Sequence, residues 1–276
     1  MRLPSNIFAY HSSDVNWCEP DYEVSSFTIE FWNSISGIPM IVSSLIMISL
    51  NDDYTRLVPN CRYANVVWWL LVVTGIGTIY FHATLSLFGQ FLDEIGIIWL
   101  GFATAAMYAE PSVVFLPSFF NTNRPLYHLL MLAAAVLVTL LSFVEPQLNH
   151  VWLFLFTLSF SLRWYKMNEA RDVINDNETF QALGRTSLVF FALAVICWVL
   201  DRVFCPFMLS IRFPYLHAVW HILVLIAANM VFVFGAFDYA NQTASRHEPY
   251  LAFVPLLGSY VGIWYVAFRL PNRKST

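Results

Sequence analysis

The chain has 276 residues, of which 58% are hydrophobic and only 12% are charged, and its formal net charge is −4. A soluble domain usually has about 25% charged residues, so this composition indicates an integral membrane protein. Long apolar runs recur along the whole chain and leave no stretch for a separate soluble domain. The small, scattered net charge gives no reason to expect a nucleic-acid partner.

The first thirty residues are polar and acidic, and they include Pro4 and Pro20. They lack the basic region followed by an apolar core that marks a cleavable signal peptide. We therefore expect residues 1–30 to form a segment outside the membrane.

Seven apolar runs approach the roughly 20 residues that an α-helix needs to cross a bilayer. They are residues 31–50, 63–82, 91–109, 126–143, 150–166, 186–204 and 215–239. We predict an all-α membrane protein with seven transmembrane helices over residues 31–239, followed by a tail over residues 240–276.

The tail contains a further apolar segment at about 250–268, which Pro255 and Gly258 interrupt. An eighth span, a re-entrant segment and an interfacial segment are all compatible with it. An eighth span would carry Arg269, Arg273 and Lys274 to the opposite face and weaken the charge bias between the two faces. We therefore favour seven spans.

The positive charges predict the orientation. With seven spans, all but three of the 14 Lys and Arg residues lie at one face, and the exceptions are Arg2, Arg202 and Arg212. Because loops rich in Lys and Arg stay in the cytosol, the N-terminus is expected to be lumenal or extracellular and the C-terminus cytosolic.

Ionisable side chains gather at the outer ends of three predicted spans. His82 ends the second span, Asp93 begins the third after a short connection, and His217 and His221 begin the seventh. His217 and His221 are four residues apart, so they share one helical face. Thr78 and His82 have the same spacing and share a face of the second span. An ionisable group within a span indicates a functional site.

Three histidines with an open fourth position are typical of a catalytic zinc site. Zinc lowers the pKa of a bound water to about 7 and so provides a hydroxide nucleophile. Asp93 could orient this water and accept its proton, and Thr78 could donate to a developing oxyanion. The alternatives are histidines that bridge helices by hydrogen bonds or that line a proton or ion path.

Other polar residues have simpler interpretations. His11, His128, His150 and His247 lie at helix ends or in loops and are expected to be ordinary surface or interfacial residues. We expect the neighbours Asp201 and Arg202, and also Asp238, to form local ion pairs near helix ends.

Three motifs in chain order, "VNWCEPDYEVSSFTIEFWNSIS", "GIGTIYFHATLSLFGQFLDE" and "LHAVWH", resemble the alkaline ceramidases. These are seven-span zinc amidases that cleave ceramide into sphingosine and a fatty acid. The resemblance implies that His82, His217 and His221 are the zinc ligands and that Asp93 lies beside the zinc-bound water. Thr78 stands where the family usually has Ser, and it keeps the hydroxyl.

The resemblance also implies a calcium site in the N-terminal segment. Its ligands would be Asn16, Trp17 through its carbonyl, Glu19, Asp21 and Glu30. Asn16 stands where Asp is common and Asp21 where Asn is common, an exchange that preserves the charge and the oxygen ligands suited to calcium. From the residues alone, without an EF-hand glycine or spacing, a solvated acidic tail is the favoured interpretation.

Cys18 and Cys205 both fall on the predicted outer side, where an oxidising lumen permits a disulfide. The resemblance suggests a bond between them that ties the N-terminal segment to the loop before the seventh span. Cys61, predicted to be cytosolic, and Cys197, predicted to lie in the membrane, are expected to be free. Four unpaired thiols are the alternative.

The predicted function is zinc-dependent hydrolysis of ceramide in the endoplasmic reticulum or Golgi, where the resemblance places the protein. The expected partners are ceramide, its two products and the bilayer, and the sequence indicates no obligate protein partner. One alternative is an adiponectin-receptor-like zinc hydrolase, which would lack the N-terminal calcium segment. Another is a seven-span receptor or transporter that binds an ion without chemistry.

Overall fold

The computed structural model describes residues 6–109, 116, 117, 119–144, 155, 178–243, 247–257 and 261–269. Its helices are α1 (Phe31–Ile35), α2 (Ile38–Leu50), α3 (Asp52–Leu57), α4 (Val66–Thr84), α5 (Leu87–Tyr108), α6 (Phe119–Thr122), α7 (Arg124–Val144), α9 (Glu178–Val203), α10 (Cys205–Ser210) and α11 (Leu216–Thr243). Its two strands are β1 (Glu248–Leu257) and β2 (Val261–Arg269).

Six candidate membrane spans are found among the described residues: α1 with α2, then α4, α5, α7, α9 and α11. They match six of the seven predicted spans. The remaining prediction, 150–166, lies outside the described residues except for Leu155, which is helical. Four helices are longer than predicted: α5 begins at Leu87, α7 covers Arg124–Val144, α9 begins at Glu178 and α11 continues to Thr243.

The first span is broken between α1 and α2 at Ser36 and Gly37. The break lies against α4, and a Cβ atom at Gly37 would come within 2.8 Å of the Gly75 carbonyl oxygen. Small residues allow helix backbones to approach closely in a membrane. This close contact brings Ser36 and the end of the N-terminal segment to the part of the bundle where α4 ends.

A very tight turn joins α4 to α5. Leu85 ends α4 in a left-handed conformation with φ of 44°, and the Ser86 hydroxyl caps α5 by accepting a hydrogen bond from the Gly89 amide at 3.1 Å. Because a connection this short makes the helices antiparallel neighbours, the last turn of α4 lies beside the first turns of α5. His82 and Asp93 are thereby brought to the same end of the bundle.

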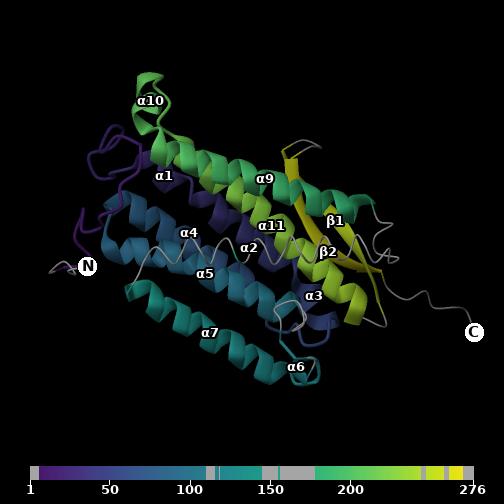
Figure 1. Ribbon diagram of the computed structural model, residues 1–276. Helices are drawn as coiled ribbons and strands as arrows, with labels where there is room; N and C mark the ends of the chain where they lie inside the picture. Colours follow the sequence, from purple (N-terminus) through teal and green to yellow (C-terminus); the bar gives the residue numbers. More distant parts are fainter. Residues whose placement is uncertain are drawn as a thin grey trace, which may run out of the picture.

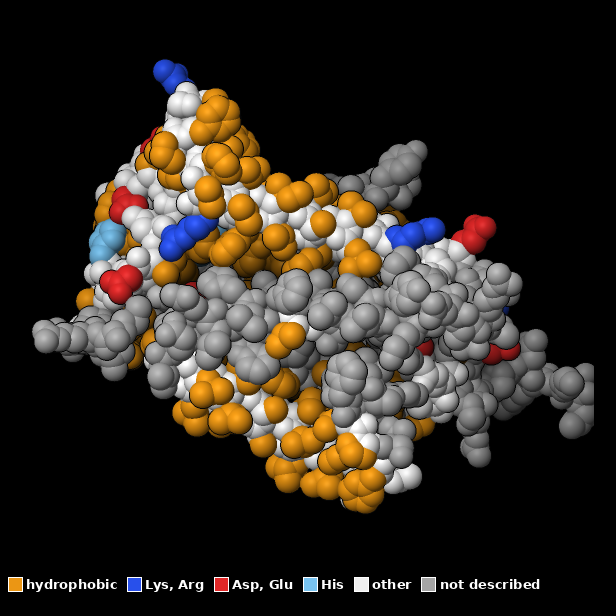
Figure 2. Space-filling model, viewed as in Figure 1, with side chains coloured by type: hydrophobic (Ala, Val, Ile, Leu, Met, Phe, Trp, Pro, Cys, Tyr) orange, Lys and Arg blue, Asp and Glu red, His pale blue; other side chains and the backbone are white. Residues whose placement is uncertain are grey.

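The bundle has two distinct ends (Figure 1). The N-terminal segment, α1 and α10 lie at one end, and α3 and the hairpin of β1 and β2 lie towards the other. Figure 2 shows hydrophobic side chains over the visible faces of α9 and α7. The exposed hydrophobic side chains of these two helices include Leu129, Leu132, Leu137, Leu140, Val189, Ile196 and Val199. Apolar side chains that face outward in this way suit a surface surrounded by lipid.

The described chain is mostly helical, in agreement with the all-α prediction, but the tail departs from it. Strands β1 and β2 pair antiparallel, with Glu248 opposite Arg269 and a register irregularity between Pro255 and Leu257. The segment is rich in aromatic and β-branched residues, which favour strands, and Pro255 is tolerated at an irregularity of this kind. Ile263 and Val266 are buried in the core, so the tail is part of the folded protein.

Candidate metal centre

Three histidine rings meet at the end of the bundle that carries the N-terminal segment. His82 comes from the last turn of α4, and His217 and His221 come from the first turns of α11. Their ring centroids are 4.5 to 5.0 Å apart, and the potential ligand atoms all lie within 4.8 Å of one another. All three residues are buried. The arrangement could hold a metal ion.

Hydrogen bonds orient two of the three rings. The Nδ1 atom of His82 lies 2.5 Å from the Glu30 carboxylate, and Nδ1 of His221 lies 2.6 Å from the Ser36 hydroxyl. If each Nδ1 carries the proton, each Nε2 is left with a free lone pair, which is how metal-binding histidines are usually held. Neither Nε2 has a hydrogen-bond partner within the described part of the chain. These buried atoms therefore fit a metal ion.

Glu30 reaches His82 because the N-terminal segment pairs with the end of α4. The backbone amides of Ile29 and Glu30 donate to the carbonyls of Ala83 and His82, at 3.1 and 3.0 Å. These carbonyls belong to the last turn of a helix, where carbonyls lack partners within the helix. The helix end is satisfied, and the Glu30 side chain is set beside the His82 ring.

Thr78 and Asp93 form a second buried pair. The Thr78 hydroxyl donates to the Asp93 carboxylate, and Thr78 lies one turn before His82 on α4. The two helices touch closely here, because a Cβ atom at Gly77 would come within 3.0 Å of the Asp93 backbone nitrogen. Since a hydroxyl has one proton, Thr78 holds Asp93 in place and cannot donate to a substrate at the same moment.

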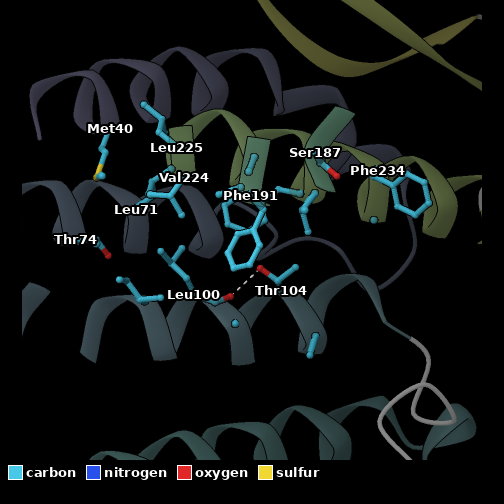
Figure 3. A pocket seen from close by; sticks show the side chains of 18 of the residues that line it. Met40, Leu71, Thr74, Leu100, Thr104, Ser187, Phe191, Val224, Leu225 and Phe234 are labelled. Atoms are coloured by element: carbon cyan, nitrogen blue, oxygen red, sulfur yellow. Dashed lines mark hydrogen bonds between the residues drawn. The ribbon is translucent and has the colours of Figure 1, made fainter. Parts of the chain in front are cut away.

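An apolar cavity of about 340 Å³ extends from this end of the bundle. At the histidine end, the cavity is lined by Thr78, Asp93 and His221. From there it continues between α2, α4, α5, α9 and α11 (Figure 3). Its lining extends along α11 as far as Asp238. The helix rise of about 1.5 Å per residue makes that distance about 25 Å. The cavity has the shape and polarity to receive a long apolar chain.

The five residues proposed for calcium belong to the N-terminal segment, where several of their polar atoms bond to protein. Glu19 accepts hydrogen bonds from the amides of Trp32 and Asn33, at 2.6 and 2.8 Å, and so caps α1. The Asn16 side chain donates to Asp21 at 3.3 Å. Burial raises the pKa of the Glu19 carboxyl to about 7. A bound cation would stabilise the ionised form of such a buried carboxyl.

Asp201 and Arg202 differ from the predicted local ion pair. Asp201 is buried and accepts from the amides of Cys18 and His217, at 3.1 and 3.2 Å. Arg202 donates to the carbonyl of Asn16 at 3.0 Å. Both side chains therefore fasten the N-terminal segment to the ends of α9 and α11. Nothing in the sequence pattern distinguishes an acid of this kind from one in a surface pair.

Cys18 and Cys205 are joined by a disulfide in the structure, at the same junction. Cys61 and Cys197 are free. Ser36, which lies against His221, carried no signal in the sequence, because a single serine near a helix break has many ordinary uses. It could have been found only by asking which residue supplies a partner for each histidine.

These features define a class: helical membrane proteins with a buried cluster of three histidines, able to hold a metal ion, at one end of an apolar cavity. A family model described as Ceramidase matches residues 9–260. The chain is 35% identical to an alkaline ceramidase of Drosophila melanogaster over 262 residues, which are 95% of this chain and 90% of the relative.

Two mammalian relatives give the same result. Alkaline ceramidase 1 of Homo sapiens is 35% identical over 267 residues, covering 97% of this chain and 98% of the relative. Alkaline ceramidase 3 of Mus musculus is 28% identical over 279 residues, covering 95% and 94%. The chain belongs to the alkaline ceramidase family.

Proposed function

We propose that this protein is a zinc-dependent ceramidase that hydrolyses the amide bond of ceramide to sphingosine and a free fatty acid. The observation that carries the proposal is the set of three buried histidines beside a long apolar cavity, whose Nε2 atoms have no hydrogen-bond partner among the described residues. Ceramide has one amide between two long chains. Its amide would lie at the histidine end, and an apolar chain would lie in the cavity.

His82, His217 and His221 are the proposed zinc ligands, and they leave a coordination position open, as catalytic zinc sites do. Zinc in this site would lower the pKa of a water molecule towards about 7 and so supply a hydroxide at neutral pH. With Nδ1 protonated, the rings of His82 and His221 donate to Glu30 and Ser36, and each Nε2 would be free to bind the ion.

Asp93 is the proposed general base, because it is buried and lines the cavity that the substrate would occupy. It would take a proton from the attacking water and return it to the leaving amine as the C–N bond breaks. Thr78 keeps Asp93 oriented through its hydroxyl. To stabilise an oxyanion as well, Thr78 has to turn its proton from Asp93 towards the substrate.

Asn16, the Trp17 carbonyl, Glu19, Asp21 and Glu30 are the proposed calcium ligands. Carboxylate, amide and carbonyl oxygens suit calcium. Glu30 also links this segment to the histidines, because it accepts hydrogen bonds from the Trp17 amide at 2.8 Å and from the His82 ring. Calcium bound there would steady the segment that covers the histidines.

The proposed orientation places the histidine end in the lumen and the C-terminus in the cytosol, in the endoplasmic reticulum or Golgi membrane. The distribution of Lys and Arg supports it. The disulfide between Cys18 and Cys205 agrees with an oxidising compartment at the histidine end.

The experiment combines metal analysis and ceramide hydrolysis on purified protein in lipid nanodiscs. We expect about one zinc per chain, loss of hydrolysis after chelation and recovery on adding zinc. His82→Ala, His217→Ala and His221→Ala should each lose zinc and nearly all activity, whereas His247→Ala, in the tail, should behave as the wild type. Metal-free wild-type protein that still cleaves ceramide at the normal rate would overturn the proposal.

A further inference from the structure

The third histidine is held differently from the other two. His82 and His221 each have a hydrogen-bond partner at Nδ1, but neither ring nitrogen of His217 has a partner among the described residues. Such partners fix the ring orientation of a metal ligand and affect metal affinity strongly. Some other contact has to fix the plane of the His217 ring.

That contact is a stack of aromatic rings. The Trp17 indole lies flat on the His217 imidazole, with centroids 3.6 Å apart and an angle of 16° between the planes. The Trp220 ring is also nearly parallel to His217, at 5.2 Å and 14°. The Arg202 guanidinium lies 5.3 Å from the Trp17 ring and so adds a cation–π contact. Stacking therefore defines the orientation of the His217 ring.

The backbone on both sides of Trp17 is fastened to the same place. The Trp17 amide donates to Glu30 at 2.8 Å, and the next amide, of Cys18, donates to Asp201 at 3.1 Å. Asp201 also accepts from the His217 amide, so one carboxylate bonds to His217 and to the residue that follows Trp17. The disulfide fixes Cys18 to Cys205, the first residue of α10. The indole consequently has little freedom to leave the His217 ring.

We propose that Trp17 is a positioning residue for His217, and that it acts through its indole ring and independently of its carbonyl oxygen. The ring does for His217 what a hydrogen-bonding partner does for His82 and His221: it holds the imidazole in the plane that presents a nitrogen to the metal. This inference rests on the proposed zinc centre.

The carbonyl and the ring can be separated by mutation. Trp17→Ala and Trp17→Leu keep the carbonyl but remove the aromatic face, whereas Trp17→Phe keeps a flat ring. Trp32→Ala is the matched control, because Trp32 lies in the adjoining part of the chain, is 43% exposed and makes ring contacts with Phe31 and Tyr215. The Trp32 backbone amide donates to the Glu19 carboxylate, and the substitution leaves this hydrogen bond in place.

Zinc affinity is measured by competition with a chelator, without any substrate. Loss of an orienting partner typically costs about 10- to 100-fold in metal affinity, and we expect a loss of this size in Trp17→Ala and Trp17→Leu. Trp17→Phe should recover most of it, and Trp32→Ala should match the wild type. Cobalt in place of zinc should give an altered visible absorption spectrum in Trp17→Leu but not in Trp17→Phe.

Calcium separates this role from the proposed ligand role of the carbonyl. Activation by calcium, measured as the ratio of rates with and without the ion, should persist in Trp17→Leu while kcat falls and KM changes little. If Trp17→Ala does not fold, the pair of Trp17→Leu and Trp17→Phe decides, with thermal unfolding as the check on folding.

Two results would overturn the inference. One is wild-type zinc affinity and an unchanged cobalt spectrum in folded Trp17→Leu. The other is a loss of zinc in Trp17→Leu that Trp17→Phe does not restore, or that appears only together with loss of the calcium response. A wild-type protein without zinc would instead refute the proposed function, so the two failures are distinguishable.

Discussion

Ser36 and His221 lie 185 residues apart in the chain, and the Ser36 hydroxyl is 2.6 Å from Nδ1 of His221. The same hydroxyl lies 2.6 Å from the Asn33 carbonyl oxygen. The Asn33 carbonyl has no proton, so the single proton of the Ser36 hydroxyl is donated to it. A lone pair of the Ser36 oxygen is then left to accept the Nδ1 proton of His221. The break between α1 and α2 thus selects the tautomer of a proposed metal ligand.

Ser36→Ala should weaken zinc binding and leave the fold intact. The substitution removes the acceptor for the Nδ1 proton, and such a loss typically costs about 10- to 100-fold in metal affinity. Chelator competition measures the effect. Ser43→Ala is the control, since the Ser43 hydroxyl bonds only to the Met40 carbonyl of its own helix. Equal zinc affinity in the two variants would show that Ser36 does not orient the ligand.

Asp93→Asn should retain zinc but lose hydrolysis, because the three histidines remain while the proposed base is gone. General-base catalysis contributes about 10²- to 10⁴-fold, and we expect kcat to fall within that range. Measured metal content and ceramide turnover on the same sample test this. Loss of zinc in parallel with activity would instead indicate that Asp93 supports the metal centre.

Thr78→Ala should lower kcat, and Thr78→Ser should restore it. The serine keeps the hydroxyl that bonds to Asp93, whereas alanine leaves the carboxylate without its orienting donor. Loss of an oxyanion-hole donor costs about 10²- to 10³-fold in other enzymes, and we expect a fall in kcat of up to that size. Turnover measured for both variants gives the comparison, and a serine variant as poor as the alanine variant would mean that packing of the Thr78 methyl group matters more than its hydroxyl.

Glu19→Gln and Glu30→Gln should each reduce the response of the protein to calcium. The buried carboxylates supply much of the negative charge of the proposed site, and affinity for calcium depends on ligand charge. The unfolding temperature measured with and without calcium should become insensitive to the ion. Glu23→Gln is the matched control, because Glu23 belongs to the same acidic segment but is exposed. An undiminished calcium response in both variants would place the site elsewhere.

The orientation in the membrane can be tested through glycosylation. Asn177 and Asn241 stand in acceptor sequences, but both are predicted to face the cytosol, where no glycan is added. Glycosidase treatment of protein from eukaryotic cells should therefore leave its electrophoretic mobility unchanged. Phe8→Thr, which places an acceptor sequence at Asn6 in the predicted lumenal segment, should produce a shift. A glycan on Asn241 would show that this residue faces the lumen and that the predicted orientation is wrong.

Much of this architecture can be predicted from the sequence, because spans and paired histidines have simple spacing. The apolar runs predict six helices that the structure describes, and residues four apart on one helix, such as His217 and His221, must share a face. The tight turn after His82 likewise predicts that Asp93 lies nearby. These inferences use distances of a few residues, which helix geometry determines.

Contacts between distant segments could not be predicted in this way. Ser36, Trp17 and Asp201 reach the histidines only because the N-terminal segment folds over the ends of α4, α9 and α11, and no local spacing encodes that. The tail was ambiguous for a different reason. Its aromatic and branched residues suit a strand and a membrane segment equally, and packing of Ile263 and Val266 into the core favours the strand.

The hairpin also has a consequence for the behaviour of the protein at the membrane surface. The outer edge of a two-stranded sheet carries backbone groups without partners, and such groups are not tolerated in the hydrocarbon. An edge that no other part of the chain covers therefore has to lie at or beyond the headgroups, where an open strand invites pairing with another chain. Pro249 and Pro255 are both in β1 and have no amide proton to offer. Strand β1 is consequently a poor template for a further strand, which protects the protein from aggregating through this edge.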